Sequence, residues 1–143
     1  MKVSVDTSTL SRGRLGNITG VVFLAHARWA FPERAWNDFP VIVIAWWLEA
    51  LSSREQNQVE CAFMDGPFAF RVSRASGGKW RIECRGRSSG PSRVALVQPS
   101  PFMRSLYTAG RNLVSACQKH GWRSREISRL ARLSVHTRVG TGA

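Results

Sequence analysis

Residues 59–86, VECAFMDGPFAFRVSRASGGKWRIECRG, decide which class of fold this chain adopts. Phe68, Phe70 and Val72 alternate with smaller or polar side chains, a period of two that predicts a strand with one apolar face. The turn-forming sequences DGP and SGG flank this strand. The segment therefore predicts a three-stranded antiparallel meander, with strands at 59–64, 68–74 and 79–85.

The register of this meander determines where two of the three cysteines lie. Cys61 and Cys84 fall on either side of Phe70, two strand spacings or about 9–10 Å apart. Because this separation exceeds the reach of a disulfide, we expect packed free thiols, as in a reducing compartment. Cys117 makes the number of cysteines odd, and neither a CxxC pair nor a Cys/His cluster has metal-ligand spacing.

The segment before the meander, residues 39–53, reads FPVIVIAWWLEALSS and is apolar nearly all round. Pro40 suits a first helical turn, and Asn37 or Asp38 suits the N-cap. We predict a helix that the rest of the fold covers on most sides. The β-branched run at 41–44 leaves a buried strand as the alternative.

The N-terminal part predicts a single long strand at residues 18–31. One face would carry alternate apolar residues: Val21, Phe23, Ala25, Ala27, Trp29 and Phe31. A turn-rich connector follows at 32–38. The glycines at 13, 16 and 20 permit an earlier short strand and a turn, whose bounds the pattern does not define.

The C-terminal part predicts two helices. Ser100 would cap a helix at 101–119 that Gly121 stops, and a second helix would run from 124 to 133. The first helix has an apolar stripe formed by Phe102, Leu106, Leu113 and Cys117. The apolar residues 94–97 leave room for one more strand.

These elements predict one α+β domain over residues 1–143. Its core, 17–90, would be an antiparallel sheet made of the long N-terminal strand and the meander, packed on the buried apolar helix. The pair of C-terminal helices at 101–134 would be basic.

The charge is strongly positive and unevenly distributed. The chain has 21 Lys+Arg against 9 Asp+Glu, a formal net charge of +12. Residues 1–88 hold 12 basic and 8 acidic side chains, whereas residues 89–143 hold 9 basic and 1 acidic. Arginine forms bidentate contacts with carboxylates and phosphates, which indicates an acidic protein or a nucleic acid as partner. A genomic arginine bias with solvated side chains is the alternative.

The sequence carries no pattern typical of catalysis or of a cofactor. His26, His120 and His136 are isolated, and the phosphate-binding, dinucleotide-binding, nucleophile-elbow and zinc-protease motifs are all absent from the sequence. Asp38 and Glu49 would lie at opposite ends of one helix, about 16 Å apart at 1.5 Å per residue. We therefore expect a binding protein rather than an enzyme, with no cofactor and no bound metal.

Two groups of residues are candidates for binding a partner. The first is Trp36 with Asp38, followed by the adjacent Trp46 and Trp47. Neighbouring helical side chains point about 100° apart, so one of the two tryptophans can reach the surface as an anchor. Burial of all the tryptophans in the core is the alternative. The second group is the basic set Arg123, Arg125, Arg129 and Arg132.

The stretch at residues 125–134, REISRLARLS, resembles the first half of a bacterial helix-turn-helix. Ile127, Leu133, Ser134 and Thr137 match positions of that pattern. Two positions depart from it, because Arg132 replaces the usual turn glycine and Arg138 an apolar residue. Glycines at 140 and 142 also fall where a recognition helix would continue.

A second resemblance covers residues 17–85. Its segments are NITG at 17–20, FPE at 31–33, WNDF at 36–39, WWL at 46–48 and FMDGPF at 63–68. Their spacing resembles that of small bacterial proteins found beside polymorphic or contact-dependent toxins as immunity proteins. The resemblance implies a cytoplasmic protein that blocks one toxin domain by covering its active site. Many such proteins are acidic, whereas this chain would suit an acidic toxin domain.

The apolar runs indicate where the protein acts. The first 17 residues lack the apolar run of a secretory signal, and the longest apolar stretch, residues 39–51, is shorter than the roughly 20 residues that cross a bilayer. We therefore expect a cytoplasmic protein without membrane contact. Its expected partner is an acidic protein such as a toxin domain, and nucleic acid is the alternative.

Overall fold

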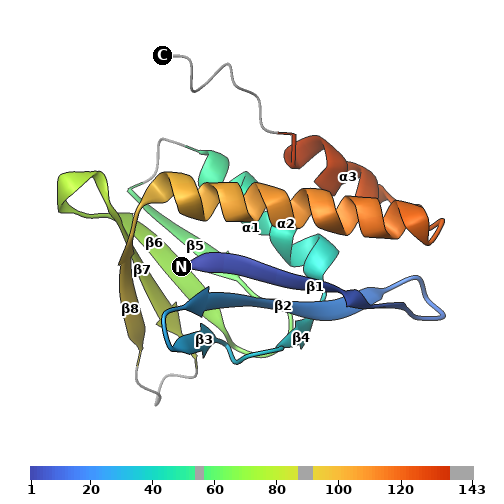
Figure 1. Ribbon diagram of the computed structural model, residues 1–143, viewed down its shortest axis with the longest axis horizontal. Coiled ribbons are helices and arrows are strands. Elements are labelled where there is room, and N and C mark those ends of the chain that lie inside the picture. Colours follow the sequence, from blue (N-terminus) through green and yellow to red (C-terminus); the bar gives the residue numbers. More distant parts are fainter. Residues whose placement is uncertain (54–56, 87–91, 136–143) are drawn as a thin grey trace.

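The computed structural model describes residues 1–53, 57–86 and 92–135. These residues form an α+β fold of two antiparallel four-stranded sheets and three helices (Figure 1). The predicted fold class is therefore confirmed. The strands divide between two sheets, however, because the N-terminal strands pair with one another rather than with the meander.

The first sheet contains a strand that the sequence did not define. β1 (Lys2–Arg12) pairs with β2 (Ile18–His26), with a register irregularity between Asp6 and Ser11. On its other edge β2 pairs with β3 (Trp29–Phe31) and with the short β4 (Asn37–Asp38). The prediction of one strand over 18–31 is wrong, because residues 27–28 form a tight turn in which Ala27 has a φ of 49°.

The second sheet confirms the predicted meander and its register. β5 (Gln58–Ala62), β6 (Ala69–Arg74) and β7 (Trp80–Arg85) pair in sequence order, and β8 (Arg93–Val97) adds a fourth strand. Cys61 and Cys84 both lie opposite Phe70, one on each flanking strand. All three cysteines are free and buried.

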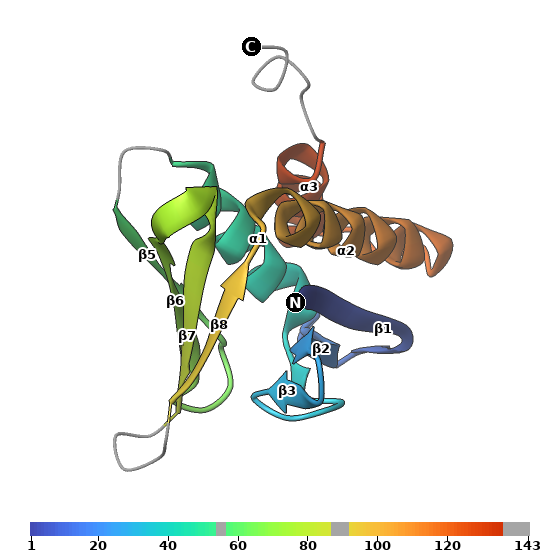
Figure 2. The ribbon, with the colours of Figure 1, turned by 60° about the vertical axis from the view of Figure 1, so that its left-hand side comes forward.

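Three helices pack on these sheets. α1 (Pro40–Ser52) contacts both other helices as well as β2 and β5, which makes it the centre of the fold (Figure 2). α2 (Pro99–Lys119) lies along β1 and buries the predicted apolar stripe. α3 (Arg125–Leu133) packs on α1 and α2.

The helix ends correct two predicted caps. Phe39 rather than Asn37 or Asp38 is the N-cap of α1, and Gln98 rather than Ser100 is that of α2. Neither cap residue forms a side-chain cap bond, and each helix begins with a proline, whose missing N–H is one donor fewer to satisfy. The predicted stop of α2 at Gly121 and the predicted start of α3 near Ser124 agree with the structure, which makes Ser124 an N-cap. Gly121 has a φ of +75°, and the Ser124 hydroxyl accepts from the Ile127 N–H at 3.1 Å.

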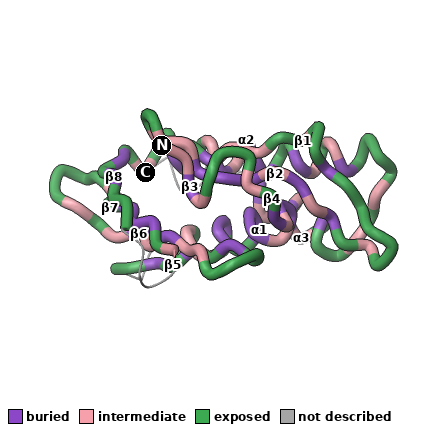
Figure 3. The backbone as a smooth tube through the Cα atoms, turned by 90° about the horizontal axis from the view of Figure 1, so that it is seen from below, coloured by how far each residue is buried: buried purple, intermediate pink, exposed green. Residues whose placement is uncertain are grey.

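One apolar core joins the two sheets and the helices. Figure 3 shows buried positions on β1, β2 and α1 and along the sheet β5–β8. Aromatic side chains link the sheets directly: the Phe31 ring of β3 lies 5.8 Å from the rings of both Phe63 and Phe68. Within the described part of the chain, no helix combines the length and apolarity needed to cross a membrane.

Candidate binding surface

Trp47 is a core residue and not a contact for a partner. Its side chain is completely buried, with ring centroids 4.9 Å from those of Phe63 and Phe70. Its indole N–H donates to the carbonyl of Ala62 at 2.7 Å, so the polar atom is satisfied inside the fold. The prediction that Trp47 contacts a partner is wrong, because its side chain has no exposed surface.

Asp38 also lies inside the fold, where only 1% of it is exposed. Its carboxylate accepts from the Phe39 N–H at 2.7 Å and from the Trp36 indole at 2.9 Å. Across the fold it accepts from the Met64 and Asp65 N–H groups, at 3.3 and 3.1 Å. These four bonds tie the start of α1 to the loop between β5 and β6. Asp38 is therefore structural, not the cap or the partner contact that we expected.

Trp36 belongs to the same junction. Its half-buried ring lies 5.1 Å from the Phe68 ring, nearly perpendicular to it. The indole bond to Asp38 and this ring contact hold Trp36 against the β5–β6 loop. Trp36 thus packs where the first sheet meets the β5–β6 loop, and part of its ring remains at the surface.

Trp46 points the other way and is 36% exposed, next to the fully buried Trp47. Glu49 lies one turn later on the same side of α1, so the two side chains are neighbours. Glu49 forms an ion pair with Arg129 of α3. The fold therefore brings Trp46 and the C-terminal arginines, which are about 80 residues apart in sequence, to one side of the molecule.

The arginines of α3 form a continuous basic strip. Arg125, Arg129 and Arg132 follow each other at i, i+4 and i+7, which places them on one helix face. The opposite face buries Ile127 and Leu130 against α1 and α2. An open groove of about 720 Å³ runs along the strip, lined by Arg123, Ser124, Arg125, Ser128, Arg129 and Arg132. We call these four arginines together with Trp46 the arginine face.

A glycine of α2 sets how closely α3 approaches. A Cβ atom on Gly110 would lie 2.9 Å from Ser134 Cβ and 3.5 Å from side-chain carbons of Leu130 and Leu48. The three helices therefore meet at this residue. Because α3 rests on this contact, the position of the arginine strip depends on it.

The described residues leave the resemblance to a helix-turn-helix untested, because its recognition helix would follow α3. Figure 1 shows α3 running back over α2 after the connection at residues 120–124. The stretch that resembled a first helix is α3, the last described helix. Thr137, Arg138 and the glycines at 140 and 142 lie outside the described residues.

Burial favours the uncharged forms of the three cysteines and of His26. Burial raises the pKa of the Cys84 thiol to about 12, and it raises the pKa of Cys61 and Cys117 as well. Burial, with the N-terminal charge adding to it, lowers the pKa of His26, whose Nδ1 is buried without a hydrogen-bond partner. Across residues 1–53, 57–86 and 92–135, no three His, Cys, Asp or Glu side chains gather as metal ligands would.

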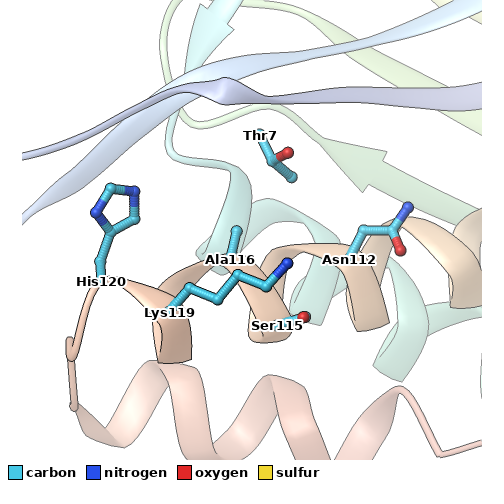
Figure 4. Close-up of a pocket in the computed structure, with 6 residues that line it drawn as sticks. All are labelled: Thr7, Asn112, Ser115, Ala116, Lys119 and His120. Carbon is cyan, nitrogen blue, oxygen red and sulfur yellow. The ribbon is translucent and has the colours of Figure 1, made fainter.

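A second, polar hollow lies between β1 and the C-terminal half of α2. Figure 4 shows Thr7 above the helix and Asn112, Ser115, Ala116, Lys119 and His120 along it. The hollow has a volume of about 260 Å³. Sequence reasoning did not find it, because one wall is β1. The spacing of the polar residues of α2 was visible, at Arg104, Thr108, Asn112, Ser115 and Lys119.

Other proteins offer no guide to either surface. No protein-family model, no curated protein and no solved structure matches this chain.

Proposed function

We propose that this protein binds an acidic partner protein through the arginine face. The observation that carries this proposal is the ion pair between Arg129 and Glu49, which joins the groove of four arginines at α3 and the turn before it to the side of α1 that exposes Trp46. Tryptophan and arginine are the residues most enriched among binding hot spots. The arginines would steer an acidic surface into place, and Trp46 would be the apolar anchor.

The form of the surface favours an inhibitor that covers its partner, as an immunity protein covers a toxin domain. α1 and α3 pack on one apolar core, so the backbone that carries the arginine face is in place before the partner arrives. A preformed surface loses little conformational entropy on binding. The N-cap at Ser124 and the close approach at Gly110 hold α3 in this position.

The experiment that tests this proposal is capture of partners from the lysate of the native host, with and without nuclease treatment. We expect one acidic protein to be retained in both arms. Trp46→Ala and the double variant Arg125→Glu with Arg132→Glu should each weaken its binding about tenfold or more. The matched control is Arg28→Glu with Arg34→Glu, which makes the same charge change on exposed loops. Equal losses in both double variants would refute a role for the arginine face.

Nucleic acid is the second candidate for the same face. The observation in its favour is that four arginines and two serines line the groove, with no acidic residue among its described lining residues. Phosphate contacts release counterions, so affinity for an oligonucleotide would fall steeply with salt concentration. Loss of all captured partners after nuclease treatment, with a steep salt dependence, would favour this candidate over the acidic protein.

A further inference from the structure

β8 is an edge strand of the second sheet, and one of its two sides is open. Within the described residues it pairs with β7 alone, and no helix or further strand packs along its other side. Figure 1 shows β8 at the margin of the molecule, and Figure 2, in which this margin comes forward, shows it in front of β7. The first sheet approaches β8 from the core side, where the Arg93 guanidinium lies 5.3 Å from the centre of the Trp29 ring.

The hydrogen bonds of the neighbouring hairpin show which residues of β8 face the open side. The Ala75 N–H donates to the Lys79 carbonyl at 2.8 Å, so these two residues form a hydrogen-bonded pair at the end of β6 and β7. Bonded and non-bonded pairs alternate along the regular register that follows, so the N–H and C=O groups of Ile82 point away from β6. They point to Ala95, the partner of Ile82 on β8. The residues on either side of Ala95 therefore turn their N–H and C=O groups to the open side.

These two residues are Val94 and Leu96, whose side chains are also exposed, by 44% and 58%. Both side chains lie on the face of the sheet opposite the helices, whereas Ala95 between them is buried in the core (Figure 2). Among the described residues, no hydrogen bond joins the main chain of Val94 or Leu96 to another element. The open side of β8 therefore presents free main-chain groups next to two apolar side chains.

The other sheet edges are protected against pairing, and β8 is not. α2 covers β1, which also has an irregular register, and β3 is only three residues long. β5 carries the exposed Glu60 and contacts α1. Cover, charge, irregular register and short length are the usual means of preventing an edge strand from pairing with another chain. From Val94 to Val97, β8 has no charge, proline or glycine, and its register with β7 is regular.

We propose that β8 pairs with the β8 strand of a second copy of this chain, antiparallel and about a two-fold axis at Ala95. Full overlap of the two strands, Arg93–Val97 on each, places Val94 opposite Leu96 of the partner subunit. Because these are the residues that face the open side, they form the hydrogen-bonded pairs of the new ladder. The two four-stranded sheets then become one sheet of eight strands, in which each copy uses the same patch.

The sequence of β8 suits pairing with itself. Ala95 lies on the axis as a non-hydrogen-bonded pair, the closer of the two kinds, where a small side chain fits. On the outer face, Val94 and Leu96 of the partner subunit cover each other and lose exposed apolar surface. The charges beside them on β7, Arg81 and Glu83, form an ion pair at 3.3 Å within each copy. The interface is therefore apolar, with its nearest charges already paired.

This interface is separate from the arginine face, because it involves neither α1 nor α3 (Figure 1). The proposal can therefore succeed or fail independently of the function proposed above. The two interactions also differ in their response to salt. Each copy carries a net charge of +12, so screening by salt should strengthen the association of two copies. Binding of an acidic partner to the arginines should weaken under the same conditions.

The test is sedimentation velocity of the full chain from about 10 µM to about 1 mM, a range that covers weak dimers. We expect a monomer that converts to a dimer as concentration rises. Val94→Glu and Leu96→Lys should each weaken the dimer about tenfold or more, because each sets a charge against an apolar side chain across the axis. The matched control is Ala62→Glu, which adds the same charge to the exposed face at the opposite edge of the sheet and should leave the dimer unchanged.

A mixture of the two weakened variants tests the register. In the full-overlap arrangement, the new carboxylate of Val94→Glu lies opposite the new ammonium group of Leu96→Lys. We therefore expect the equimolar mixture to dimerise about tenfold or more tightly than either variant alone. Equal urea denaturation midpoints would show that the substitutions, both at exposed positions, leave each copy folded.

Hydrogen exchange tests the main-chain bonds directly. The amides of Val94 and Leu96 should exchange more slowly as the protein concentration rises, because they become bonded to the second copy. The Ala95 amide, which faces β7, is the internal control and should not change.

Four outcomes would overturn the proposal. A monomer throughout the concentration range excludes pairing of two copies, and a dimer that survives both substitutions must form elsewhere. A mixture no tighter than the single variants excludes the full-overlap register. Slower exchange of the Val94 and Leu96 amides only on addition of a different protein would assign the open side of β8 to that protein.

Discussion

The two sides of α1 use the same residue types in opposite ways. On the inner side, Trp47 and the preceding Asp38 have all their polar atoms bonded within the fold. On the outer side, Trp46 is exposed and Glu49 pairs with one arginine of α3. The residue type alone, tryptophan or acid, therefore does not show whether a position belongs to the core or to a binding site. Burial and hydrogen-bond partners distinguish the two.

Truncation of the two adjacent tryptophans gives the largest contrast. Trp47→Ala should lower the free energy of unfolding by about 4 kcal/mol, because it opens a large cavity between rings and leaves the Ala62 carbonyl without its donor. Trp46→Ala should lower it by less than about 1 kcal/mol, as is usual for exposed positions. Urea denaturation of both variants measures the difference. Similar losses in the two would contradict the division of α1 into an inner and an outer side.

Removal of the buried carboxylate should have the next largest effect. Asp38→Ala leaves four N–H donors without an acceptor, which should cost about 3 kcal/mol of stability. The amides of Met64 and Asp65 should then exchange faster with solvent. The matched control is Asp65→Ala, which removes an exposed acid nearby and keeps the N–H group that Asp38 accepts. A loss as large in the control would show that charge at this loop, not the bonds of Asp38, stabilises it.

The difference between the inner and outer sides also explains how much of the fold could be predicted. The meander was predictable because each strand has one buried face and glycine-rich turns, so local pattern and tertiary structure agree. β1 gave a weaker signal, since several polar residues and a register irregularity interrupt the alternation at an edge strand. The turn at Ala27 has neither glycine nor proline to mark it.

The candidate surface was predictable in composition but not in geometry. The arginines of α3 follow from helical spacing alone, whereas the spacing left open whether one of the two adjacent tryptophans faces outward or both are buried. Asp38 resembled a helix cap because it precedes Pro40, yet two of its donors come from a loop 26 and 27 residues away. The pairing of Glu49 with Arg129 likewise depends on tertiary packing.

A substitution where α3 meets α2 tests whether the outer surface depends on the inner contacts. Gly110→Ala should lower the free energy of unfolding by about 2 kcal/mol, because the new methyl group would overlap Ser134 and meet Leu130. Adding Ser134→Gly removes the overlapping Cβ and should restore part of the loss. Gly13→Ala is the control, since its Cβ would meet only the Asn17 carbonyl at 3.8 Å. A stabilised single variant would mean that α3 does not rest on Gly110 as described.

The smallest expected effect on stability comes from the acid on the outer side. Glu49→Gln breaks an exposed ion pair, so the free energy of unfolding should change by less than about 0.5 kcal/mol. Its effect on affinity for an acidic partner should be larger and favourable, because Glu49 competes with that partner for Arg129. We therefore expect the variant to bind that partner more tightly, most clearly at low salt, where screening is weak. Glu126→Gln is the matched control, as it removes an exposed acid of α3 outside the lining of the arginine groove. If only the Glu49 variant gains affinity, the ion pair restrains a binding residue; if neither does, Arg129 serves only to hold α3 against α1.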